Sequence, residues 1–171
     1  MDNERLRVCI ESYREGDKNA FAEMYNDLKT PVFTIVYRMT RSREMSEDIL
    51  QDLFVKLYRS PPDVAVVKNP RAYIFQMARN LTLNSMRGVQ SVELNEELGD
   101  GASFADAVVW QVDIAEAMSR LPGDEVEIVS LRVNGELKFR EIAELLGTPL
   151  GTVLWKYRKA VQTLRSYLNG G

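Results

Sequence analysis

The chain has 171 residues, of which 45% are hydrophobic, so it can form one large or two small domains with a buried core. Its single cysteine, Cys9, excludes an intramolecular disulfide and is typical of a reducing compartment. It has no histidine, which removes the most common general base and metal ligand, so we expect no enzyme activity, cofactor or metal site. The sequence shows no signal peptide and no apolar run near the roughly 20 residues of a membrane span. We therefore expect a cytoplasmic protein that does not insert into membranes.

The net charge of −3 is unevenly distributed along the chain. Residues 91–131 carry ten acidic and one basic side chain, whereas residues 132–171 carry seven basic and three acidic ones. Residues 61–90 are also basic, with four basic side chains and one acidic. Because phosphate repels the central segment and attracts the segments on either side, a nucleic acid could be bound at two separate places.

Apolar residues at helical spacing predict helices over most of the chain. The first helix covers residues 3–15. The second covers residues 18–40, and Pro31 is expected to kink or break it. The third follows Ser46, which we predict as its N-cap, and acidic residues in its first turn suit the positive end of the helix dipole.

A fourth helix is predicted to begin at Asn69 and Pro70, a cap followed by a first-turn proline, and to end near Gly88. On a helical wheel its inward face consists of Ile74, Met77, Ala78, Leu81 and Ser85. One flank aligns an aromatic ring, two amides and an arginine: Tyr73, Asn80, Asn84 and Arg87. Such a stripe suits unstacked bases, although periodicity alone slightly favours the polar rim of an ordinary amphipathic helix.

The apolar pattern stops over residues 89–111, which are acidic and contain several glycines. We interpret this segment as a linker between two small helical domains, residues 1–88 and residues 112–171. The second domain is predicted to contain four helices, at residues 112–120, 123–132, 139–146 and 149–168.

The cap and turn residues between the last two predicted helices are typical of a helix-turn-helix, a common motif for binding duplex DNA. Gly147 suits a left-handed C-cap, Thr148 is predicted to cap the next helix, and Pro149 suits its first turn. The outer face of that helix carries Thr152, Trp155, Lys156, Arg158 and Lys159. Their position favours DNA contacts over a merely solvated surface. For the tryptophan, packing on a neighbouring helix, contact with a thymine methyl group and a protein interface all remain open.

Five segments follow one another along the chain: AFAEMYND, SEDILQDLFVKLYRS, NPRAYIFQMARNLTLNSMR, LRVNGELKFREIAELLGTPLGTV and YRKAVQTLR. In this order they resemble the successive segments of the extracytoplasmic-function sigma factors of bacterial RNA polymerase, over nearly the whole chain. The resemblance implies an all-α fold in which a sigma region 2-like bundle is joined by the acidic linker to a sigma region 4-like helix-turn-helix. It implies promoter-specific transcription initiation, with core RNA polymerase and promoter DNA as partners, an anti-sigma factor as a further partner, and a monomer when free.

The resemblance implies roles for residues at positions that match the family's motifs. Polymerase contact is implied for four residues of the segment SEDILQDLF: Asp48, Gln51, Asp52 and Phe54. Strand opening and the capture of a flipped minus-ten base are implied for Tyr73 and Asn80, which lie on the flank found from the helical wheel. We extend this minus-ten surface to three further residues: Arg79, Asn84 and Arg87. The outer face of the last helix becomes the minus-thirty-five surface. The linker either mimics nucleic acid inside polymerase or is only a solubilising tether.

The chain departs from the family directly after the helix-turn-helix turn. Leu154, Trp155 and Lys156 stand where a basic residue, a serine and an arginine are usual, so the sequence does not predict which promoter bases are read. Two alternatives remain. A stand-alone helix-turn-helix regulator would have to dimerise on a two-fold site. A sigma-like adaptor would bind polymerase or a partner without recognising a promoter.

Overall fold

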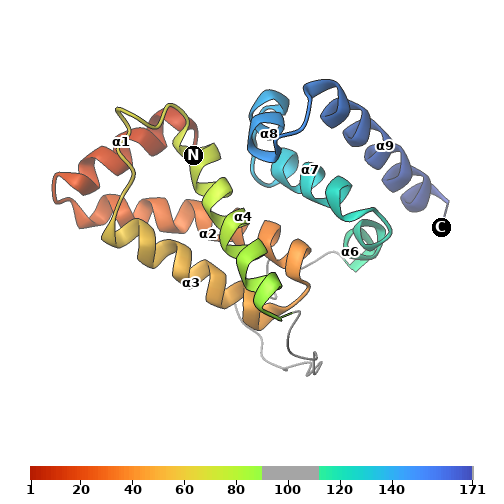
Figure 1. Ribbon diagram of the computed structural model, residues 1–171, viewed down its shortest axis with the longest axis horizontal. Coiled ribbons are helices and arrows are strands. Elements are labelled where there is room, and N and C mark those ends of the chain that lie inside the picture. The colour runs from red at the N-terminus through yellow and green to blue at the C-terminus, as the bar shows by residue number, and fades with distance from the viewer. Residues whose placement is uncertain (90–111, 171) are drawn as a thin grey trace.

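A computed structural model describes residues 1–89 and 112–170. The part of the chain that it describes contains eight α-helices and no strand, which confirms the predicted all-α class. A first group lies at the left of Figure 1 and consists of α1 (Asn3–Arg14), α2 (Lys18–Thr40), α3 (Arg43–Arg59) and α4 (Pro70–Val89). A second group lies beside it and consists of α6 (Val112–Ser119), α7 (Gly123–Val133), α8 (Phe139–Leu146) and α9 (Leu150–Asn169). The predicted acidic linker falls on residues 90–111, outside the described residues.

Helix α3 begins four residues earlier than its sequence pattern indicated. Ser42 is the N-cap, and its Oγ accepts a hydrogen bond from Met45 N at 3.3 Å. Ser46 is fully buried, and its hydroxyl donates to the Ser42 carbonyl at 2.6 Å and lies 2.8 Å from Thr40 Oγ1. The prediction of Ser46 as N-cap is therefore wrong, because two serines lie one helical turn apart and the earlier one has the extended backbone that a cap requires.

Helix α2 runs through Pro31 as a single element. Leu28 and Val32, on either side of the proline, are both fully buried. An interior proline costs about 3 kcal/mol in an isolated helix, and here the burial of a continuous apolar face on both sides of it offsets that cost. The helix packs against α1, α3 and α4, and also against α7 of the second group.

The turn between α8 and α9 has the predicted left-handed residue, since Gly147 has φ 61° and ψ 32°. Thr148 does not cap α9. Its hydroxyl donates to the Leu146 carbonyl at 3.4 Å, and its backbone N–H donates to the Ala143 carbonyl at 3.0 Å. Pro149 occupies the N-cap position instead, without a side-chain cap bond. Thr148 therefore donates hydrogen bonds to carbonyl groups at the end of α8 and does not cap the start of α9.

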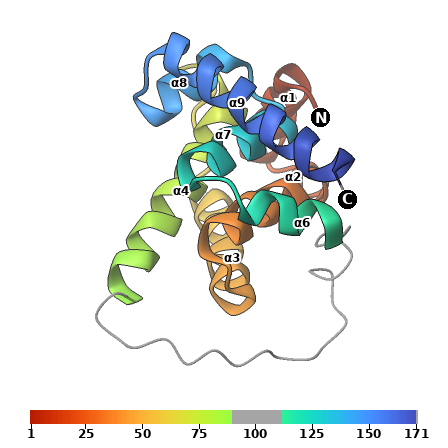
Figure 2. The same ribbon diagram turned by 90° about the vertical axis from the view of Figure 1, so that its right-hand side faces the viewer.

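The two groups of helices are packed together through α7, which lies between α9 and α2 (Figure 2). Its Ile128 and Leu131 belong to an apolar cluster that includes residues of α2, α3 and α4. Its Val126 and Val129 belong to a second cluster formed with α6 and α9. Because α7 is apolar on two sides, it joins the two halves of the molecule into one packed body.

The turn of the helix-turn-helix provides a test of local conformation. Gly147→Ala places a Cβ in open space but in the left-handed region, so we expect the free energy of unfolding to fall by about 1 kcal/mol. Gly151→Ala also meets open space, but inside α9, and should raise it by about 0.5 kcal/mol. Urea unfolding of both variants measures the difference, and equal effects of the two substitutions would contradict the assigned turn.

Candidate nucleic-acid interface

Helix α4 carries the surface predicted to bind unpaired bases. Its first turn is fixed by Asn69, whose Oδ1 accepts a hydrogen bond from Ala72 N at 2.9 Å, so the predicted cap is confirmed. Four of the predicted residues are exposed along the helix: Tyr73, Asn80, Asn84 and Arg87. This stripe combines an aromatic ring that can stack, amides that can read base edges and a cation for phosphate.

The buried face of α4 is rotated from the one expected from the helical wheel. Ile74 and Ala78 are buried as predicted, but Phe75 and Thr82, which are not on the predicted inward face, are also fully buried. Three residues expected to face inward are only partly buried: Met77, Leu81 and Ser85. The cause is tertiary, because α4 contacts α8 in addition to α1, α2 and α3, and a wheel of one helix contains no information about that second layer.

Arg79 differs from the other predicted minus-ten residues, because its side chain is directed toward the second group of helices. Its Nε donates a hydrogen bond to Glu127 Oε1 of α7, and the two groups form an ion pair. The Arg79 and Glu127 side chains are only 25% and 12% exposed. The structure therefore brings four predicted residues together on an open stripe and leaves the fifth bound inside a contact between the two halves.

Helix α9 presents the predicted minus-thirty-five residues on its outer face. Trp155 is 59% exposed, Arg158 is exposed and Thr152 is half-buried. The ammonium group of Lys159 lies 5.3 Å from the centroid of the Trp155 ring, a cation–π arrangement that covers part of the indole. The sequence left three roles open for Trp155. Its exposure argues against one of them, packing on a neighbouring helix.

The two lysines of this face are held by acidic residues at the start of α7. Lys159 Nζ lies 2.9 Å from Glu125 Oε1, and Lys156 Nζ forms an ion pair with Asp124. The hydrogen bond from Lys156 holds the pKa of the Asp124 carboxyl below its ordinary value of 3.8. Glu125 is 4% exposed, and its Oε2 is buried without a hydrogen-bond partner in the described part of the chain.

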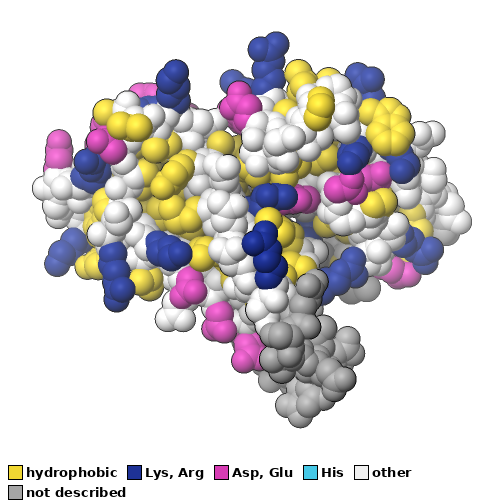
Figure 3. Space-filling model, in the orientation of Figure 1, with side chains coloured by type: hydrophobic (Ala, Val, Ile, Leu, Met, Phe, Trp, Pro, Cys, Tyr) yellow, Lys and Arg dark blue, Asp and Glu magenta, His cyan; other side chains and the backbone are white. Residues whose placement is uncertain are grey.

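The face of the molecule shown in Figure 3 is mixed in charge, with basic side chains scattered among acidic and apolar ones. Since nonspecific DNA binding depends on clustered cations, this face offers little long-range attraction to DNA.

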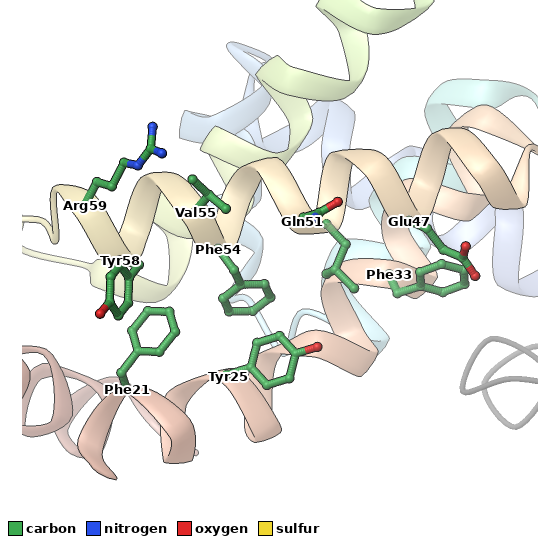
Figure 4. Close-up of a pocket in the computed structure, with 10 residues that line it drawn as sticks. Phe21, Tyr25, Phe33, Glu47, Gln51, Phe54, Val55, Tyr58 and Arg59 are labelled. Atoms are coloured by element: carbon green, nitrogen blue, oxygen red, sulfur yellow. The ribbon is translucent and has the colours of Figure 1, made fainter. Parts of the chain in front are cut away.

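The residues predicted to bind polymerase lie on α3, beside an apolar groove of about 650 Å³ between α2 and α3 (Figure 4). Asp48, Gln51 and Asp52 are exposed. Gln51 lies at the groove, and Phe54 forms part of its floor, 5% exposed and with its ring 4.7 Å from that of Tyr25. Gln51 and Phe54 therefore line a concave surface, whereas Asp48 and Asp52 are exposed elsewhere on the same helix.

Part of the lining of the groove was not predicted from the sequence. Tyr25 of α2 and Val55 and Tyr58 of α3 line the groove and are between 38% and 53% exposed. Phe21 of α2 closes one end and packs edge-on against Tyr58, with ring centroids 5.3 Å apart. The available signal was the presence of tyrosines and a valine beside the apolar stripes of α2 and α3, where a solvated helix surface would have charged residues.

Residues 1–89 and 112–170 contain neither a candidate metal site nor a candidate membrane span. No group of three or more His, Cys, Asp or Glu side chains there could hold a metal ion. None of the helices in those ranges is both long enough and apolar enough to cross a bilayer.

Comparison with known proteins identifies the two halves separately. Residues 24–92 match the family described as Sigma-70 region 2, and residues 111–164 match Sigma-70, region 4. The first match contains α3 and α4, with most of the groove and the exposed stripe of α4, and the second contains the helix-turn-helix. The fold and its two surfaces thus define a sigma-70-type transcription factor.

Similar curated proteins give the subfamily. The chain is 26% identical to the ECF RNA polymerase sigma factor SigW of Bacillus subtilis, over 95% of this chain and 96% of SigW. It is also 26% identical to the ECF RNA polymerase sigma factor SigK of Mycobacterium ulcerans, over 96% of this chain and 94% of SigK. The protein belongs to the extracytoplasmic-function (ECF) sigma factors of RNA polymerase, as the order of its motifs predicted.

Solved structures share the fold. The sigma factor RpoE of Bartonella quintana, crystallised with the anti-sigma factor NepR, matches with a TM-score of 0.63 and 20% identity over 83% of this chain and 92% of RpoE. CnrH, in complex with the cytosolic domain of CnrY, matches with a TM-score of 0.63 and 15% identity over 97% of this chain and 98% of CnrH.

The ion pair between Lys156 and Asp124 has a measurable consequence. We expect the pKa of Asp124 to lie below 3.8 in the native chain and to rise toward that value in Lys156→Met. Because the native pKa is lowered, the pair stabilises the fold above pH 3.8 and loses its effect as the pH falls through the native pKa. NMR titration of the Asp124 carboxyl measures this. Lys159→Met is the control, and an Asp124 pKa that responds equally to both substitutions would contradict the pairing.

Proposed function

We propose that this sigma factor binds core RNA polymerase through the α2–α3 groove, captures unpaired minus-ten bases on α4 and reads the minus-thirty-five duplex with α9. Residues 1–88 and 112–171 act as its two domains. The exposed stripe of α4 carries the proposal, because it places a stacking ring, two amides and an arginine in line on one helix, where a bundle needs none of them for its core.

Capture on α4 can offset much of the free-energy cost of flipping one base. Flipping a base costs a few kcal/mol of stacking and pairing, and stacking on an aromatic side chain returns about 1–3 kcal/mol per base. Tyr73 is 38% exposed and can supply this stacking, while Asn80 and Asn84 can donate to and accept from a base edge. A duplex has no such edges available in the same geometry, so the stripe favours the opened strand.

The α2–α3 groove suits an amphipathic helix of the polymerase. Its half-exposed tyrosines offer large, rigid contact surfaces of the kind that dominate binding energy at protein interfaces. Asp48 and Asp52 are exposed on the same helix and favour a basic flank on the partner. We therefore assign the polymerase contact to Asp48, Gln51, Asp52 and Phe54 together with Tyr25, Val55 and Tyr58.

To bind duplex DNA, the lysines of α9 must exchange their carboxylate partners for phosphate groups. Lys156 and Lys159 each have a carboxylate partner, so binding a phosphate requires them to leave it, and the net electrostatic gain is small. Trp155 gives up no ion pair, only its cation–π contact with Lys159, and can contact a thymine methyl group in the major groove. We propose that Trp155 contributes most to this contact, with Thr152 and Arg158 beside it.

The remaining assignments follow from this role. Polymerase supplies the chemistry of RNA synthesis, so the chain is not itself an enzyme and acts in the cytoplasm as a monomer until it joins core. Two structurally similar proteins were solved in complexes, one with the anti-sigma factor NepR and the other with the cytosolic domain of CnrY. We propose an anti-sigma partner for this chain too.

Reconstituted transcription tests the proposal. Full-length protein and bacterial core polymerase are supplied with fragmented genomic DNA, and transcript starts are mapped. We expect starts that require the protein. Asn80→Ala should reduce them at least tenfold, because it removes a base-reading amide, while Asn169→Ala, the same change at an exposed position at the end of α9, should not.

Binding to core is measured in the same preparation. Val55→Arg places a cation in the apolar groove and should weaken co-elution with core at least tenfold. Val66→Arg is the matched control, since Val66 is 76% exposed in the loop before α4 and outside the groove. Retained binding by Val55→Arg would reject the groove. Binding to core without any protein-dependent start would favour the adaptor, and a stable dimer that reads DNA but does not bind core would favour the stand-alone regulator.

A further inference from the structure

Two cations on the outer face of α9 are already neutralised by carboxylates of α7. Lys156 forms an ion pair with Asp124. Lys159 Nζ lies 2.9 Å from Glu125 Oε1. Both carboxylates come from the first turn of α7. Carboxylates and phosphate oxygens bind the same donor groups, so a lysine that keeps its carboxylate releases no counterion when DNA binds and adds nothing to charge-driven affinity.

The ion pair of Lys159 is costly to break. The side chain of Glu125 is buried, and its Oε2 has no hydrogen-bond partner in the described part of the chain. Lys159 therefore compensates the charge of this carboxylate, and moving the ammonium group to a phosphate would leave a buried, unpaired charge behind. In the other pair, the hydrogen bond from Lys156 lowers the pKa of the Asp124 carboxyl and keeps it ionised at neutral pH. Both pairs therefore favour staying intact in the presence of DNA.

Lys159 also positions the indole ring of Trp155. Its ammonium group lies 5.3 Å from the ring centroid while it is bonded to Glu125, so a carboxylate, an ammonium group and a ring form a chain from the buried start of α7 to solvent. Trp155 lies in the second turn of α9 and is 59% exposed. One turn before it, a Cβ added at Gly151 would meet nothing within 4 Å. The indole is thus held by Lys159 and remains accessible to a base.

An exposed indole between two neutralised lysines suits a methyl group better than a phosphate. The N-terminal residues of a recognition helix contact base edges in the major groove. Thymine presents its C5 methyl group there, and cytosine presents a methyl group on the same carbon only when it is modified to 5-methylcytosine. Burying one such group against the ring is worth about fourfold in affinity.

We propose that α9 reads the C5 methyl group of a pyrimidine through Trp155, and that Asp124 and Glu125 are positioning residues that hold the two lysines away from phosphate. This inference rests on the proposed function, because it requires α9 to enter the major groove of duplex DNA. Its consequence is a duplex contact that depends weakly on salt and strongly on the presence of the methyl group.

The test measures binding of the full-length chain to duplexes of about 20 base pairs, or two turns of DNA, by fluorescence anisotropy. Because Trp155 is exposed in the free chain, no polymerase is needed. Alternating A·T pairs are compared with A·U pairs, which lack only the methyl group, and alternating G·C pairs with G·5-methylcytosine pairs, which gain it. We expect the methylated duplex to bind about fourfold more tightly in each comparison, and Trp155→Ala to lose that preference. A preference in one comparison alone would support the contact and identify its source as thymine or 5-methylcytosine.

Two further variants test the carboxylates. Asp124→Asn and Glu125→Gln keep the shape of the side chain and release one lysine each. Each variant should steepen the slope of log affinity against log salt, measured between about 50 and 200 mM, by about one. It should also reduce the methyl preference, because phosphate contacts then hold α9 where no methyl group lies. Glu4→Gln, an equal loss of charge at an exposed position on α1, should change neither quantity.

Equal affinity of the native chain for methylated and unmethylated duplexes would overturn the inference. The absence of duplex binding, or a salt slope that neither carboxylate variant changes, would overturn it as well. Failure of the proposed function has a different signature. The free chain would then keep its methyl preference, while core polymerase supplied with the chain would produce no protein-dependent transcript starts.

Discussion

The packing of α7 against two layers at once is the contact on which the rest of the molecule depends. One side of this helix is needed by α6 and α9, and the other is covered by α2. A helix with two apolar sides cannot leave either layer without exposing hydrophobic surface to water. The free-energy cost of that exposure is about 25 cal/mol per Å² of apolar surface. The packing of the two halves into one body follows from this.

The acidic residues of α7 add ion pairs to that apolar contact. Asp124, Glu125 and Glu127 all lie within the first two turns of the helix, and each pairs with one cation on α9 or α4. The acidic charge of residues 91–131 is therefore not confined to the predicted linker, since part of it is folded against basic side chains of α4 and α9.

Local features of this structure were predictable from the sequence, and long-range ones were not. The boundaries of α2 and the left-handed Gly147 depend on nearby residues, so apolar spacing and a glycine were sufficient. The cap of α3 was placed one turn late because two serines fit the pattern. The burial of Phe75 and the Arg79–Glu127 pair depend on contacts between segments far apart in the chain. The α2–α3 groove could not be predicted from the sequence for the same reason, since its tyrosines come from two different helices.

The packing of the two halves through α7 can be measured directly as a distance. Nitroxide labels at Lys56→Cys on α3 and Gln162→Cys on α9, both exposed positions, are introduced in a Cys9→Ser background. Double electron–electron resonance of the free chain should give one narrow distance, because α7 joins the two halves into one packed body. A broad distribution of distances would contradict this account, since it would mean that the two halves move independently.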